Sequence, residues 1–210
     1  MTSFFKNIIP LVSLLAFCWS CNDDKITTSK PVTPTKTITS PVVIDSSKIL
    51  LVHEKHENGN TKFYGTAYDT VYHGYCKTFF LNETISSQGN YVLGLKEGWW
   101  EYFHDNGQLQ ECGHYSANLQ TGTWKYFNYY GSLVTETNFY EGEQNGWEKK
   151  YVNDTLIEEC EYRFGKKEGY YHLYENGILI LKGNYFNNAK VGVWKTFNNK
   201  GKIVHEEDFG

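Results

Sequence analysis

Glycine recurs along most of this 210-residue chain at a nearly constant interval. The recurring positions are Gly74, Gly98, Gly122, Gly146, Gly169 and Gly192, which are separated by 24, 24, 24, 23 and 23 residues. A period of this length is typical of repeat proteins, in which one small supersecondary unit is stacked many times. We therefore predict a repeat domain over residues 74–210, with one unit starting at each of these glycines.

Each unit has the pattern of a β-hairpin. Aromatic residues follow the unit glycine, as Trp124 and Tyr126 follow Gly122, and a turn such as Asn176-Gly177 comes next. Asn-Gly between apolar runs is the strongest short-range hairpin signal. A second strand then leads to a Gly or Asn four residues before the next unit glycine. Because these residue types adopt positive φ at low cost, both ends of this closing loop are expected to have positive φ.

The predicted fold class is therefore all-β: an elongated, single-layer antiparallel meander of about six to seven β-hairpin repeats of 23–24 residues. About a fifth of residues 48–210 are aromatic and no proline follows Pro41, which favours strands and excludes a disordered body. An earlier segment, residues 48–73 with Asn58-Gly59 at its turn, is predicted to be a partial repeat that caps the N-terminal end.

Large aromatic residues recur at one phase of the repeat. A single-layer sheet has no second layer to bury side chains, so we expect these rings to pack in a row and to supply the core themselves. The residues of this predicted structural ladder are Trp100, Trp124, Tyr171 and Trp194. Three tyrosines near turns and outside the ladder phase are the candidates for an exposed binding surface: Tyr129, Tyr130 and Tyr140.

The unit pattern Gly-x-Trp-x-x-Tyr/Phe, then Asn-Gly-x-Leu-x-x-Glu, then Tyr and a Gly-x-x-x-Gly turn, resembles the MORN repeat variant of bacterial proteins. Two copies depart from it: the first has Cys76 at the Trp position, and the fourth has Glu148 there, next to Trp147. The resemblance implies a long twisted meander of hairpins. It also implies a role as an antitoxin or immunity component, because many members of this variant are regarded as antitoxins of toxin–antitoxin pairs.

The N-terminus has the features of an export signal. Lys6 precedes an apolar run at residues 8–17, which is too short to span a bilayer and suits a secretory signal. With Ser20 before Cys21, the segment resembles a bacterial lipoprotein signal, in which residues 1–20 are removed and Cys21 is lipidated. The sequence departs from such signals at Cys18, where Leu is usual, and the alternative is an ordinary signal peptide with a coincidental cysteine.

The segment after Cys21 is predicted to be a tether. Ser, Thr and Pro make up 13 of the 26 residues from Asn22 to Ser47, so residues 21–47 cannot bury enough surface to fold. Asp23-Asp24 resembles the surface-export signal of lipoproteins in some Gram-negative groups. These resemblances imply a lipoprotein of the cell envelope, in the outer membrane and facing either the cell surface or the periplasm.

Charge and residue spacing exclude several function classes. The formal net charge is −4 and no basic run exists, so no nucleic acid partner is expected. Gly-x-Ser-x-Gly is absent, and His53 and His56 have no partner at metal-ligand spacing, so neither catalysis nor a metal or other cofactor is expected. Four glutamates recur near one phase and are predicted to form a solvated face with nearby lysines: Glu111, Glu136, Glu158 and Glu206.

Three cysteines remain after export: Cys76, Cys112 and Cys160. If the shorter spacing reflects one residue missing from the turn of the fourth unit, Cys160 corresponds to Gly113 and not to Cys112. The two cysteines then face opposite sides, about 19 Å apart, which is beyond disulfide reach. We expect buried free thiols.

Three classes of function follow, and all are non-enzymatic. The first is a repeat-sheet scaffold on an envelope lipoprotein that binds an unknown protein partner. The second is an immunity or antitoxin component, as the family resemblance implies. The third is a lipid- or glycan-binding module, although the acidic body argues against anionic lipids.

Overall fold

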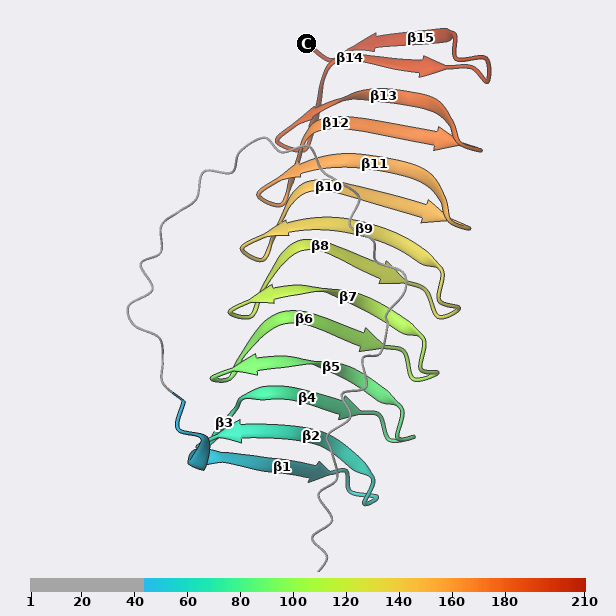
Figure 1. Ribbon diagram of the computed structural model, residues 1–210. Coiled ribbons are helices and arrows are strands. Elements are labelled where there is room, and N and C mark those ends of the chain that lie inside the picture. The colour runs from blue at the N-terminus through green and yellow to red at the C-terminus, as the bar shows by residue number, and fades with distance from the viewer. Residues whose placement is uncertain (1–43) are drawn as a thin grey trace, which may run out of the picture. The chain divides into compact units, whose positions relative to one another are not determined.

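The computed structural model describes residues 44–210, which form one antiparallel sheet (Figure 1). Each strand pairs with the strands before and after it in the chain, in the order β1-β2-β4 to β15, with β3 beside β2. The all-β, single-layer meander is therefore confirmed. The predicted signal peptide, Cys21 and the tether up to residue 43 lie outside the described residues. Within residues 44–210, no helix is long and apolar enough to cross a membrane.

The sheet consists of about seven hairpins. The strands are β1 (Ile49–Lys55), β2 (Thr61–Tyr68), β3 (Val71–Tyr72), β4 (Gly74–Phe79), β5 (Ile85–Val92), β6 (Leu95–Phe103), β7 (Leu109–Ser116), β8 (Leu119–Phe127), β9 (Leu133–Tyr140), β10 (Glu143–Val152), β11 (Thr155–Arg163), β12 (Lys166–Glu175), β13 (Ile178–Phe186), β14 (Ala189–Phe197) and β15 (Ile203–Asp208). A short 3-10 helix, η1 (Ser46–Lys48), precedes β1. The segment predicted to be a partial N-terminal repeat is a complete hairpin, formed by β1 and β2.

Turns within hairpins line one long edge of the sheet, and turns between hairpins line the other (Figure 1). We call these the tip edge and the link edge. Most tip turns follow one form, in which the Gly107 N–H donates to the His104 carbonyl and the His104 N–H donates to the Gln108 carbonyl. Two tip turns, Asn153-Asp154 and Asn176-Gly177, are one residue shorter. The φ angles are 48° at Asn153 and 58° at Asp154, and 51° at Asn176 and 75° at Gly177. These two turns occur in the units with a 23-residue spacing, so the change of turn type accounts for the shorter period.

Turns at the link edge differ from the prediction. They are two-residue turns in which both residues have positive φ, such as Ala117 at 50° and Asn118 at 69°, as a type I′ turn requires. The unit glycine is not the far end of this loop, because it lies inside the next strand. Gly122 has a φ of 66° and occurs where β8 has two more residues than the facing part of β7. The expected positive φ is present, but it serves a β-bulge within the strand.

The core lies on one face of the sheet, which we call the ladder face. Trp124 is 0% exposed, and its ring lies over Gly113 of the preceding strand, so closely that a Cβ atom on Gly113 would overlap the ring. The Trp124 Nε1 donates to the His114 carbonyl at 3.1 Å. Trp100 over Gly89 and Trp194 over Gly183 repeat this arrangement, each with the matching Nε1 hydrogen bond. Each of these three ladder tryptophans thus needs a glycine beneath it, because only a residue without Cβ leaves room for the ring.

Cross-strand register places two of the four recurring glutamates on the opposite face. Glu136 pairs with Lys125 at 3.3 Å there, and Glu206 pairs with Lys195 at 3.1 Å. The prediction is wrong for Glu111 and Glu158. Each lies two residues before a ladder position, Gly113 and Cys160 respectively, so the two-residue periodicity of a strand turns it towards the ladder face.

The three cysteines are free and buried, as expected. Cys160 is opposite Glu148 and Tyr171, in the ladder row, whereas Cys112 is opposite Glu101 and Lys125, on the other face. Burial raises the pKa of Cys76 and of Cys160 to about 11, so both thiols are protonated at neutral pH.

Candidate functional site

The tryptophan ladder is interrupted in the middle of the sheet, at β9 and β10. Glu148 of β10 occupies the position of the ladder tryptophan, and the buried Thr137 of β9 occupies the position of the glycine beneath it. Trp147, the neighbouring aromatic residue, faces the other side, where its ring stacks on His172 at 6.3 Å between centroids. The fourth unit has therefore replaced an aromatic contact with a polar one.

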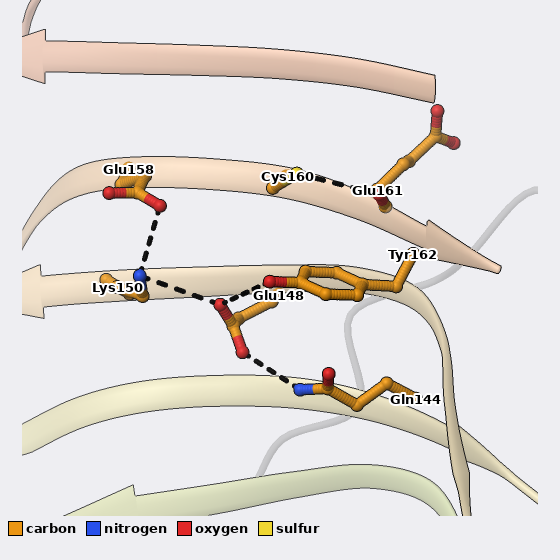
Figure 2. Close-up of polar contacts among 7 residues, drawn as sticks. All are labelled: Gln144, Glu148, Lys150, Glu158, Cys160, Glu161 and Tyr162. Carbon is orange, nitrogen blue, oxygen red and sulfur yellow. Dashed lines mark hydrogen bonds and ion pairs between the residues drawn. The ribbon is translucent and has the colours of Figure 1, made fainter. Parts of the chain in front are cut away.

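Polar contacts hold Glu148 from both sides (Figure 2). The Gln144 side-chain amide donates to Glu148 Oε2 at 3.0 Å, and the Tyr162 hydroxyl donates to Oε1 at 3.4 Å. Lys150 Nζ lies 3.7 Å from Glu148 and 3.1 Å from Glu158. Cys160 Sγ, beside this group, donates to the backbone carbonyl of Glu161 at 3.5 Å.

The surroundings of this cluster shift the pKa of Lys150 and of Tyr162. Desolvation acts to lower the pKa of Lys150, but hydrogen bonding and attraction to Glu158 and Glu148 outweigh it, and the pKa is raised. Desolvation, followed by the charge of Glu148, raises the pKa of Tyr162. Lys150 shared between Glu148 and Glu158, with the Tyr162 hydroxyl and the Gln144 amide beside them, is a mutually satisfied structural group. Within residues 44–210, no three His, Cys, Asp or Glu side chains are grouped so that they could hold a metal ion.

The three tyrosines predicted to form a binding surface do not lie together. Tyr129 and Tyr130 are neighbours in a tip turn, with ring centroids 6.3 Å apart, and the Tyr129 hydroxyl donates to Asp105 at 3.0 Å. Tyr140 ends β9 at the link edge, so the length of that strand, roughly 25 Å, separates it from the other two. They belong to two different edges of the sheet.

Tyr140 instead continues a row of exposed apolar side chains along the link edge. We define the link-edge stripe as Val71, Val92, Leu95, Leu119 and Tyr140. All five are between 41% and 47% exposed, and the cross-strand register places them on the face opposite the tryptophans. The sequence signal that could have found them is the aliphatic residue directly after a link turn, as at Leu95 and Leu119.

Hydrogen bonds between successive link turns hold this row in place. The Asn118 N–H donates to the Lys96 carbonyl at 3.0 Å, and the Gly142 N–H donates to the Gln120 carbonyl at 2.9 Å. The Leu119 side chain lies against Gly142 of the following turn. Three members of the stripe, Val71, Leu95 and Leu119, therefore recur at the same repeat position, about 10 Å or two strand spacings apart, on a hydrogen-bonded framework.

A search against models of protein families and a search of curated proteins gave no match to this chain. The architecture alone defines its class: a long antiparallel meander of hairpin-like strands, consistent with a repeat protein.

Proposed function

We propose that this protein is a non-enzymatic scaffold that binds a protein partner along its link edge. The observation that carries the proposal is the link-edge stripe, which exposes apolar side chains on one face of consecutive hairpins, three of them at the same repeat position. Single exposed apolar residues are ordinary on soluble proteins, whereas aligned ones mark interaction surfaces. In a repeat sheet the binding energy is then spread across several units, and no single pocket is needed.

Negative charges introduced into the stripe are expected to abolish partner capture. Leu95→Glu together with Leu119→Glu places two carboxylates in the apolar contact, while the fold is kept because both side chains are about half exposed. The measurement is capture of proteins from the native cell envelope by the wild-type body and by the variant, with circular dichroism of both. Val152→Glu, at a tip turn and 52% exposed, is the matched control. Equal capture by all three proteins contradicts the proposal.

We also propose that the repeat is a MORN-type variant and that the chain is an envelope lipoprotein. The six-copy pattern supports the first statement, and the leader of residues 1–20, followed directly by Cys21, supports the second. An immunity role against an incoming toxin is the alternative function that the resemblance supports, and the link edge would then be the surface that binds the toxin. A toxin gene adjacent to this one favours immunity, whereas a secretion or polysaccharide locus favours the general scaffold.

Lipid anchoring makes a separate prediction. Cys21→Ser removes the thiol that would carry the lipid, so the protein is expected to move from the membrane fraction to the soluble fraction. Immunoblotting of the two fractions measures this, with Cys18→Ser as the matched control. A shift with Cys18→Ser and none with Cys21→Ser shows that the proposed cleavage site is wrong.

A further inference from the structure

Beyond Tyr140, the exposed side chains of the link edge include charged residues as well as apolar ones. A shallow hollow of about 450 Å³ opens there between two successive link turns. It is lined by Arg163, Phe164, Lys166, Glu168, Phe186 and Asn187. The register places Arg163, Lys166 and Phe186 on the same face as the stripe, so the hollow continues the same row.

Two phenylalanines of the hollow are exposed at positions where the core does not need them. Phe164 is 57% exposed and Phe186 is 60% exposed, and neither ring contacts another aromatic ring within residues 44–210. Phe164 also has a φ of 46°, in the left-handed region that bulky side chains rarely adopt. Asn occupies the equivalent position of the next link turn, at Asn187, without this steric conflict. The other link turns have the same backbone at this position, with φ of 49° at Leu93 and of 50° at Ala117 and Glu141, so the feature that sets Phe164 apart is its exposed aromatic ring beside Phe186.

The charge of the hollow is positive. Arg163 is paired with Glu168 at 3.2 Å, whereas the ammonium of Lys166 makes no ion pair within the described part of the chain. One cation is therefore left without a counter-charge beside two exposed rings. A guanidinium already held by one carboxylate still has N–H donors for a second.

We propose that this hollow binds an apolar side chain flanked by a carboxylate, within an acidic segment of a protein partner. The apolar side chain packs between Phe164 and Phe186, and the carboxylate pairs with Lys166 and Arg163. The inference rests on the proposed scaffold function. It also fixes the orientation of the bound partner, whose aliphatic part lies along the stripe and whose acidic part lies at β11 to β13.

The test uses a capped eight-residue peptide with a central Phe-Leu pair flanked by aspartates, and the same peptide with lysines in their place. Amide chemical shifts of the protein, followed by NMR at low salt, report binding. The acidic peptide is expected to bind at least tenfold more tightly than the basic one and to shift residues 163–168 and 186–187. Lys166→Glu is expected to remove this preference. Equal affinity for the two peptides overturns the inference.

Phe164→Asn separates binding from folding. Asparagine adopts positive φ more easily than phenylalanine, so the thermal midpoint is expected to stay the same or to rise, while affinity for the acidic peptide falls at least tenfold. Leu93→Asn is the matched control, because Leu93 is at the equivalent turn position with a φ of 49° and lies outside the hollow. Unchanged peptide affinity in Phe164→Asn contradicts the inference.

Two further outcomes are decisive. Binding to vesicles of phosphatidylglycerol and phosphatidylethanolamine, with neither peptide bound, identifies a membrane contact and overturns the inference. If the stripe variants abolish partner capture while Lys166→Glu and Phe164→Asn leave peptide binding unchanged, the scaffold stands and the hollow is not its acidic anchor. If the hollow variants act as expected and the stripe variants do not, the scaffold proposal fails.

Discussion

Trp124→Ala is expected to lower the free energy of unfolding by about 3 to 5 kcal/mol. The ring is fully buried, and its centroid lies 4.9 Å from that of Tyr115 and 6.5 Å from that of Phe139. A single-layer sheet has no second layer to close over the space left behind. The loss therefore includes the apolar transfer energy, the cavity and the Nε1 hydrogen bond to His114.

Urea denaturation followed by tryptophan fluorescence and circular dichroism measures this loss. Trp99→Ala is the matched control, since Trp99 directly precedes the ladder residue Trp100 but faces the other side, where it is partly exposed and contacts His114. Its loss of stability is expected to be less than half that of Trp124→Ala. Equal losses for the two variants contradict the assignment of the core to the ladder face.

Gly113→Val is expected to cost about 3 kcal/mol, the upper part of the usual range for overpacking. The added Cβ atom overlaps the Trp124 ring, and the branch at Cβ allows no rotamer that avoids it. Either the ring leaves its position or β7 and β8 separate locally. Thermal and urea unfolding of the variant measure the effect.

Gly122→Val is the control that separates crowding from backbone strain. Gly122 has positive φ, but no atom lies within 4 Å of a Cβ placed there. The expected cost is about 1 to 2 kcal/mol from the left-handed backbone alone. If Gly122→Val is as damaging as Gly113→Val, the close packing of ring on glycine is not the dominant constraint.

The repeat period was sufficient to predict the fold because one hairpin per period leaves few alternatives. The position of the unit glycine was predicted less well. In the sequence, a Gly or Asn lies four residues before Gly122 and before Gly146, and each such pair looks like the two ends of one loop. A type I′ turn needs positive φ at two adjacent residues, however, and the first is Ala117, Glu141 or Phe164, none of which signals a left-handed backbone in sequence.

The glycines beneath the tryptophans were missed for a different reason. Gly89, Gly113 and Gly183 do not recur in every unit, since Thr137 and Cys160 take their place in the middle of the sheet. Their role depends on which ring in the next strand covers them, and that is a property of cross-strand register. Periodicity along one chain does not show it.

The residues of the binding surface also could not be predicted from periodicity, because their grouping depends on their positions in the folded sheet. Tyr130 and Tyr140 are only ten residues apart in sequence but lie at opposite edges, because β9 runs between them. Burial of Leu95 and Leu119 would have been the usual expectation for leucines in strands, and their exposure follows from the absence of a second layer over that face.

We infer that a glycine in one strand and a tryptophan in the next form one stabilising unit that joins neighbouring hairpins. A double-mutant cycle of Thr137→Gly and Glu148→Trp in the interrupted fourth unit, measured by urea denaturation, tests this claim. Glu148→Trp alone is expected to destabilise the protein, because the Thr137 side chain occupies the space that the ring needs and the Lys150 partner is lost. With Thr137→Gly present, the ring can settle as Trp124 does over Gly113, and the coupling energy is expected to be favourable by about 1 to 3 kcal/mol. Additive effects of the two substitutions would contradict the claim.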